Sequence, residues 1–283
     1  MRRVGVCEER GSGIDKAVFG HSGHTTYPEL ILRPGHVASA TPGVTYGNTG
    51  CCGWIATKMQ LYKLNKTVLS ICHNPAQFLN GLTSNSLDKP RNAFLNVHGR
   101  IVAAFDQIKV DEDEYWIVVE TPYVDKLLGH VDRYVKLSGV QIQKLEKCVY
   151  YRPENRGEDK GAITIPQKKG QMLIAGEMAG ASPPDAAFTL LRLKRRMPLQ
   201  GVDYTDDFAL NVDPDEYVSF AKGCFLGQEP VSKVHNRSRP TWQLMVQYED
   251  ECDEETKAKM TSKALDPDTN RVIGFTFIRN QGD

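Results

Sequence analysis

The most informative stretch of the sequence lies at 222–229 and reads Lys222-Gly223-Cys224-Phe225-Leu226-Gly227-Gln228-Glu229. Two glycines four residues apart permit a tight loop with exposed backbone amides. The thiol of Cys224 lies near Lys222 and just before a predicted helix start at Pro230, and both a cation and a helix N-terminus favour the thiolate. One interpretation is therefore a reactive or ligand-contacting thiol. The other is a small buried residue in a glycine turn, and the spacing alone favours this second interpretation.

Upstream of this loop, strand-like and helix-like segments alternate. The helix predicted at 76–82 has Asn74 as its expected N-cap and Pro75 at its first position. A second, amphipathic helix is predicted from Thr121 to Gly139 because apolar residues recur there at helical spacing. The order strand, helix, strand, strand, helix, strand predicts an α+β sandwich with antiparallel sheets. The expected strands are at 66–72, 92–97, 101–110, 115–120 and 140–151.

The second half of the chain shows a weaker pattern. A hairpin is predicted from 162–165 and 171–175, followed by a helix at 185–196 whose last turn is basic. Strands at 241–248 and 271–278 flank a charged stretch at 249–270, for which no regular structure is expected. These two strands predict a small C-terminal β unit.

Residues 1–58 have a different composition from the remainder of the chain. They hold 10 of the 24 glycines but only 6 of the 35 basic and 4 of the 35 acidic residues, and no helical or strand period persists. Met59 then opens a segment that reads as a protein start. We therefore expect 1–58 to be a disordered or artefactual extension, and an ordered N-terminal arm is the alternative.

The 222–229 stretch resembles the signature of the YgfZ-type folate-binding proteins. These are relatives of the glycine-cleavage T-protein that act in the assembly or repair of iron–sulfur proteins. Further stretches resemble the same family and follow its order across about 60–283. They are Gly81–Asn85, Phe94–Val102, Leu127–Tyr134, Leu191–Leu193 with Pro198, and Gly201–Tyr204.

The resemblance implies a fold, a ligand and a set of site residues. The fold is an α+β, T-protein-like folate-binding module of ferredoxin-like α/β sandwiches at 59–236, with a short C-terminal β-barrel-like unit at 237–283. The ligand is tetrahydrofolate, the partners are iron–sulfur client proteins, and Cys224 is the functional thiol. A pterin–glutamate ligand needs a cleft, a few placed polar groups and basic residues for its carboxylates. The candidate binding residues are Asn85, Asn96, Arg100, Arg192, Lys222, Gln228 and Arg237.

Two departures from the T-protein pattern bear on activity. Ala103 and Ala104 stand where aminomethyltransferases carry an aspartate pair, and alanine can neither stabilise a developing cation nor exchange a proton. Lys194 stands where a glutamate would recognise the pterin edge, and an ammonium cannot accept a hydrogen bond. The expectation is therefore an accessory protein rather than an enzyme. The alternatives are a divergent folate-dependent aminomethyltransferase and a ligand-free interaction module.

The composition limits the remaining possibilities. Equal numbers of basic and acidic residues, 35 of each, argue against general nucleic-acid binding, which needs a basic surplus. No apolar run is long enough to span a membrane, and no signal peptide is recognisable, so a cytoplasmic location is expected. The 7 cysteines are odd in number and include no Cys-x-x-Cys pair, so neither a disulfide framework nor a metal site is predicted.

Overall fold

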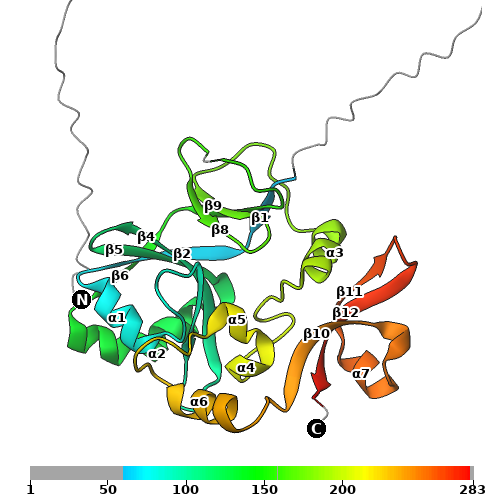
Figure 1. Cartoon of the computed structure of the whole chain (residues 1–283). Coiled ribbons are helices and arrows are strands. Elements are labelled where there is room, and N and C mark those ends of the chain that lie inside the picture. The colour runs from blue at the N-terminus through cyan, green and yellow to red at the C-terminus, as the bar shows by residue number, and fades with distance from the viewer. Residues whose placement is uncertain (1–59, 158, 281–283) are drawn as a thin grey trace, which may run out of the picture. The chain divides into compact units, whose positions relative to one another are not determined.

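The computed structural model describes residues 60–157 and 159–280, and the predicted extension at 1–58 lies outside these residues. The described part is a mixed α/β fold with three antiparallel sheets (Figure 1). The first sheet has the strand order β3-β4-β5-β2-β6. Its strands are β2 (Lys66–Cys72), β3 (Arg91–Leu95), β4 (Ile101–Asp111), β5 (Glu114–Glu120) and β6 (Gln141–Leu145).

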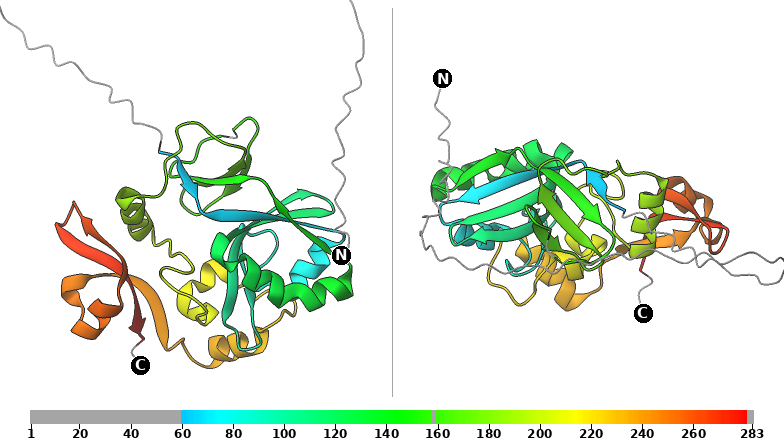
Figure 2. Two further views of the ribbon diagram at one scale, coloured as in Figure 1. Left: turned by 180° about the vertical axis from the view of Figure 1, so that it is seen from behind. Right: turned by 90° about the horizontal axis from the view of Figure 1, so that it is seen from above.

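Two helices cover one face of the first sheet. They are α1 (Pro75–Leu82) and α2 (Val124–Ser138), the latter preceded by the 3-10 turn η1 (Thr121–Tyr123). Because successive strand residues point to opposite faces, Leu69 and Ile71 of β2 meet the helices while Val68 points to the other side. The helices contribute Leu79 and Leu127 to this core. In Figure 2 both helices lie on the same side of the sheet.

The second sheet packs against the face of the first sheet that the helices leave free. Its order is β1-β7-β9-β8, and Val149 and Ile174 from its strands meet Val68 and Val118 of the first sheet. On this sheet, Tyr62 and Tyr151 contact Phe188 of helix α3 (Ala186–Arg195). The strands are β1 (Tyr62–Leu64), β7 (Cys148–Arg152), β8 (Ile163–Pro166) and β9 (Gln171–Ala175).

The third sheet has three strands in the order β10-β12-β11. A core that includes Leu193 of α3, Leu210 of α4, and Leu244 and Phe275 of the sheet joins it to the preceding segments. No helix in the described ranges is long and apolar enough to cross a membrane. The elements of this part are α4 (Ala209–Val212), α5 (Pro214–Tyr217), α6 (Gln228–Arg237), β10 (Trp242–Tyr248), η2 (Glu249–Glu251), α7 (Glu254–Lys259), β11 (Thr261–Asp266) and β12 (Arg271–Arg279).

The structure corrects three sequence predictions. The single strand expected at 140–151 is two strands, because the chain turns at Lys147 and passes from the first sheet to the second. The charged stretch at 249–270 contains α7 and β11, and the side chain of Asp253 caps α7. Asn74 does occupy the N-cap position of α1, but in a left-handed conformation without a capping bond. Its side chain donates instead to Gln77.

A chain of alternating charges crosses the centre of the described fold. Asp106 of β4, whose side chain is only 1% exposed, lies 3.4 Å from Lys66 Nζ and 3.3 Å from Arg91 Nε. Lys66 also pairs with Glu120, and Arg91 with Glu216 of α5. Burial alone lowers the pKa of Lys66, but the charges of Glu120 and Asp106 outweigh it and raise this pKa above its usual value.

We expect Asp106→Asn to destabilise the fold strongly. The substitution leaves two buried cations without one of their carboxylates, and breaking a buried ion pair costs about 3–5 kcal/mol. Urea unfolding measures the loss. Asp132→Asn is the matched control, because Asp132 pairs with Lys136 on the exposed side of α2 and should change stability little. Equal effects of the two substitutions would contradict the structural role of the buried chain.

Candidate functional site

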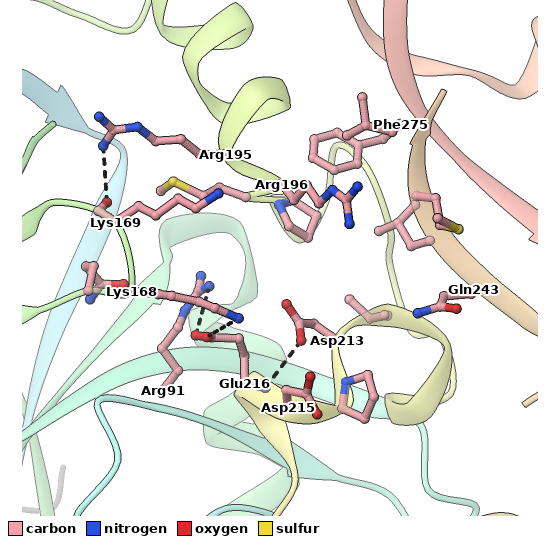
Figure 3. A pocket seen from close by; sticks show the side chains of 18 residues that line it. Arg91, Lys168, Lys169, Arg195, Arg196, Asp213, Asp215, Glu216, Gln243 and Phe275 are labelled. Carbon is pink, nitrogen blue, oxygen red and sulfur yellow. Dashed lines mark hydrogen bonds and ion pairs between the residues drawn. The ribbon is translucent and has the colours of Figure 1, made fainter. Parts of the chain in front are cut away.

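A cavity of about 420 Å³ opens between α3, α5, β10 and the turn that joins β8 to β9 (Figure 3). Its size falls in the range of small-molecule sites. Five basic and three acidic side chains converge on it. They are Arg91, Lys168, Lys169, Arg195 and Arg196, and Asp213, Asp215 and Glu216. A second hollow of about 830 Å³ lies beside α7 and β12, and only two basic residues line it.

The basic side chains that line the cavity, called here the cationic wall, are positioned by hydrogen bonds to residues outside the cavity. Gln167 donates a 3.2 Å hydrogen bond to Asp106, which holds the β8–β9 turn against β4 and places Lys168 beside the cavity. Arg195 is anchored through hydrogen bonds to the hydroxyl of Tyr151 and the carbonyl of Pro153. Arg196 ends α3 in a left-handed conformation, with φ of 52°. Figure 3 shows Lys168, Lys169 and Arg195 on the side of the cavity opposite Gln243 and β10, whereas the side chain of Arg196 extends toward Phe275.

The acidic wall comes from α5. Glu216 pairs with Arg91 and with Lys168, 3.6 Å away. Asp213 caps α5 by accepting a hydrogen bond on Oδ1 from the Glu216 amide, and its side chain points into the cavity in Figure 3. Burial, with a smaller contribution from Glu216, raises the pKa of Asp213 above its usual value. Asp213 lines the cavity, and none of the described hydrogen bonds uses its Oδ2.

The third wall is strand β10. Four consecutive residues, Gln243 to Val246, line the cavity together with Phe275 of the neighbouring strand β12. Because side chains alternate along a strand, four consecutive lining residues indicate that the cavity reaches the edge of β10. Phe275 of the inner strand β12 shows that it also reaches one face of this sheet. The cavity thus has a cationic wall, an acidic wall and a wall of strand backbone.

The 222–229 loop lies outside this cavity. It forms hydrogen bonds with the residues that follow α1. Lys222 Nζ donates to the carbonyls of Thr83 and Asn85, at 2.6 and 3.0 Å. Gly227 has φ of 84° and approaches Asn96 so closely that a Cβ there would lie 2.3 Å from the Asn96 carbonyl oxygen. The sequence prediction of a tight glycine turn is therefore confirmed at Gly227, where no other residue fits.

None of the eight predicted site residues lines the cavity. Asn85 lies next to it, because its amide donates to the backbone carbonyls of two lining residues, Arg91 and Glu216. Arg192 is buried in an ion pair with Asp203 at 2.7 Å and also donates to Ser262, which ties α3 to β11. Their roles in ligand binding remain predictions.

The other predicted residues lie around the 222–229 loop or beyond it. Asn96 accepts hydrogen bonds from two backbone amides of its own turn, and Arg100 donates to the carbonyl of Asp206. Gln228 begins α6, two residues before the predicted start, and Arg237 is exposed at its end. Cys224 is exposed to solvent. In the described ranges, no group of three or more His, Cys, Asp or Glu residues is placed to hold a metal ion.

The three residues that depart from the T-protein pattern have defined places. Ala103 and Ala104 are buried in β4, and the amide of Ala104 donates to Gln200 at 2.8 Å. Lys194 is directed away from the cavity and pairs with Asp266 and Asp268 beside β11. These three positions therefore supply no carboxylate to the cavity.

The comparisons with known proteins bear on the fold. No family model and no curated protein matches the chain. Among solved structures, the chain is similar to the crystal structure of glycine cleavage system aminomethyltransferase T from Bartonella henselae. The TM-score is 0.62 at 12% identity, over 78% of each chain. At this identity the likeness shows the fold alone: the chain has a T-protein-like fold.

The residues that line the cavity were missed by the sequence analysis, with one partial exception. The run Lys194-Arg195-Arg196 is visible as a basic cluster, but a helix C-terminus explains it equally well. Lys168-Lys169 could have been noticed as a basic pair in a hairpin turn. Glu216 belongs to a helix of four residues that Asp213 caps, and this helix is too short to give a periodic signal.

Lys222 provides a pH-dependent test of the loop. Burial lowers its pKa to about 8, so between this value and about 10.4 the unfolded chain binds more protons here than the folded chain does. The contribution of this group to stability therefore rises with pH through that window. We expect the stability difference between the wild type and Lys222→Met to grow from pH 7 to pH 10 in urea unfolding. Lys233→Met, on the exposed side of α6, should show no such growth.

Proposed function

We propose that this protein binds tetrahydrofolate in the cavity between α3, α5 and β10 and supports the assembly or repair of iron–sulfur proteins. The observation that carries the folate part is a cavity lined by both cationic and acidic side chains within a T-protein-like fold. A reduced folate has N–H donors on its pterin edge and carboxylates at its other end. These two ends match an acidic wall and a cationic wall.

The acidic wall offers one carboxylate with a free acceptor. Glu216 is occupied by Arg91 and Lys168, and Asp215 is exposed. Asp213 lines the cavity and keeps Oδ2 unused by the described hydrogen bonds, so we propose that it accepts from the pterin edge, a role for which Lys194 is unsuited. The cations of the β8–β9 turn and of α3 would then receive the glutamate carboxylates.

The strand order supports the finer description of the fold. In the first sheet, β6-β2-β5-β4 with α1 and α2 follows the order of a ferredoxin-like sandwich, and β3 extends it at the edge. We propose that 59–236 forms the ligand-binding module and that 237–283 closes one side of its cavity. An open cavity of about 420 Å³ favours a ligand-binding protein over a ligand-free interaction module.

Calorimetry with tetrahydrofolate under reducing conditions tests the folate part. We expect binding of the wild-type protein and an approximately tenfold or greater loss of affinity for Asp213→Asn, because an amide replaces one acceptor of a charge-assisted pair with a donor. Asp215→Asn is the matched control on the same helix and should bind like the wild type. If the wild-type protein fails to bind at millimolar tetrahydrofolate, the folate part is wrong.

The iron–sulfur part rests on Cys224, which the 222–229 loop presents to solvent. We expect Cys224→Ala to fold normally and to bind tetrahydrofolate, since Cys224 does not line the cavity. It should fail to restore iron–sulfur enzyme activity in a strain that lacks the native protein. Cys252→Ala should restore that activity, because Cys252 is partly buried beside η2. Full complementation by Cys224→Ala would count decisively against a functional thiol.

A further inference from the structure

The second hollow, beside α7 and β12, has the opposite charge balance to the cavity described above. Four acidic and two basic side chains line it, so its lining carries a net charge of −2. Its volume of about 830 Å³ is large enough for several side chains of a bound molecule. The acidic residues are Asp207, Glu251, Asp253 and Glu255, and the basic residues are Lys259 and Arg279.

The residues around the hollow leave part of this negative charge without a cationic partner. Six of the seven residues at 249–255 are acidic, and only five of these six form ion pairs, with Lys257, Lys259, Lys263 and Arg271. The sixth, Asp253, accepts the Thr256 amide at the start of α7 and forms no ion pair within the described residues. Asp207 accepts the Thr205 amide and also has no cationic partner there. Both carboxylates can therefore receive a cation from another molecule.

Uncharged side chains of the hollow also have unused hydrogen-bonding groups. Thr276 of β12 lines the hollow with only 3% of its surface exposed, yet none of the described hydrogen bonds uses its hydroxyl. Buried hydroxyls are normally paired, so this one indicates a polar group of a bound molecule. The side-chain amides of Asn211 and Gln247 are likewise unused in the described part of the chain. Trp242, at the start of β10, adds an aromatic ring that is 45% exposed.

The acidic segment beside the hollow already binds one guanidinium group. Arg271 donates to Asp250 at 2.8 Å and to Glu251 at 2.7 Å, and its guanidinium carbon lies 3.7 Å from the centre of the Tyr248 ring. A planar guanidinium can pair with carboxylates and stack on an aromatic face at the same time, whereas an ammonium group is a compact point charge. Carboxylates beside an aromatic ring therefore favour arginine over lysine.

We propose that the second hollow is a docking site for an extended, arginine-bearing segment of a partner protein. The ring of Trp242 receives a guanidinium group, Asp207 and Asp253 neutralise its charge, and the hydroxyl of Thr276 pairs with the backbone of the segment. Tryptophan and arginine are also the residues that contribute most often to the binding energy of protein interfaces. The proposal does not depend on folate binding, because none of these residues lines the cavity between α3, α5 and β10.

Calorimetry of the full chain with two blocked pentapeptides tests the proposal. One alternates alanine with arginine, and in the other citrulline replaces arginine with a neutral group of the same shape. We expect the arginine peptide to bind roughly tenfold more tightly or better, because charge-assisted contacts are formed. The double variant with Asp207→Asn and Asp253→Asn should lose this preference, and asparagine still caps α7. Asp132→Asn, on the exposed side of α2, should keep it.

Three results of this experiment would overturn the proposal. They are equal affinities for the two peptides, absence of binding at millimolar arginine peptide, and an unchanged preference in the double variant. Agmatine, a small free guanidinium compound, should bind roughly tenfold more weakly than the peptide or worse, because it lacks the backbone contacts. Equal affinities for agmatine and the peptide would assign the hollow to a small amine and would also overturn docking of a partner segment.

Fluorine NMR of the protein labelled with fluorotryptophan locates the bound peptide without a charge substitution. The resonance of Trp242, assigned with the variant Trp242→Phe, should shift on addition of the arginine peptide and stay in place with the citrulline peptide. Trp116 is the internal control, because its indole donates to Glu114 within the first sheet, and its resonance should not move. An unmoved Trp242 resonance in the presence of bound arginine peptide would place the peptide elsewhere and overturn the proposal.

Discussion

The carboxylate of Asp106 links the first and second sheets through polar contacts, in addition to the apolar core that packs between them. It lies on β4 and contacts Lys66 on β2, Arg91 on β3 and Gln167 in the β8–β9 turn, and thereby joins the first sheet to the second. A buried carboxylate is tolerated only where cations and donors compensate its lost hydration. The same compensation fixes the positions of Arg91 and of the β8–β9 turn, both of which line the cavity. The stability of the centre and the geometry of the candidate site therefore depend on one cluster.

The cavity is a product of this arrangement and not of any local segment. Its walls come from strand β10, the C-terminus of α3, the β8–β9 turn and the four-residue helix α5. Residues outside the cavity hold these elements in place. Arg192 fixes the end of α3 through Asp203, and Asn85 fixes α5 and the start of β3 through the carbonyls of Glu216 and Arg91. Two residues predicted as ligand contacts thus support the cavity from outside it.

The sequence was sufficient to predict those parts of the fold that are determined by residues close together in the chain. The β-branched and apolar residues of β2, the helical spacing of Leu127 and Val131 in α2, and the Gly227 turn were all predictable. The break between β6 and β7 was not predictable from the sequence. Both segments are strands, and they differ only in the sheet to which each belongs. The cavity was missed because its charged residues come from four separate segments of the chain, at 91, 168–169, 195–196 and 213–216, and no sequence period reports their meeting. The likeness to aminomethyltransferase T supports the fold that the resemblance implied, and the finer family assignment remains a proposal.

A crystal structure of the protein with 5-formyl-tetrahydrofolate, a stable reduced folate, tests the central claim most directly. The account predicts ligand density in the cavity, with the pterin beside Asp213 and the glutamate between Arg196 and the edge of β10. A ligand bound instead at the 222–229 loop, or a cavity that stays empty in crystals grown with millimolar ligand, would contradict it.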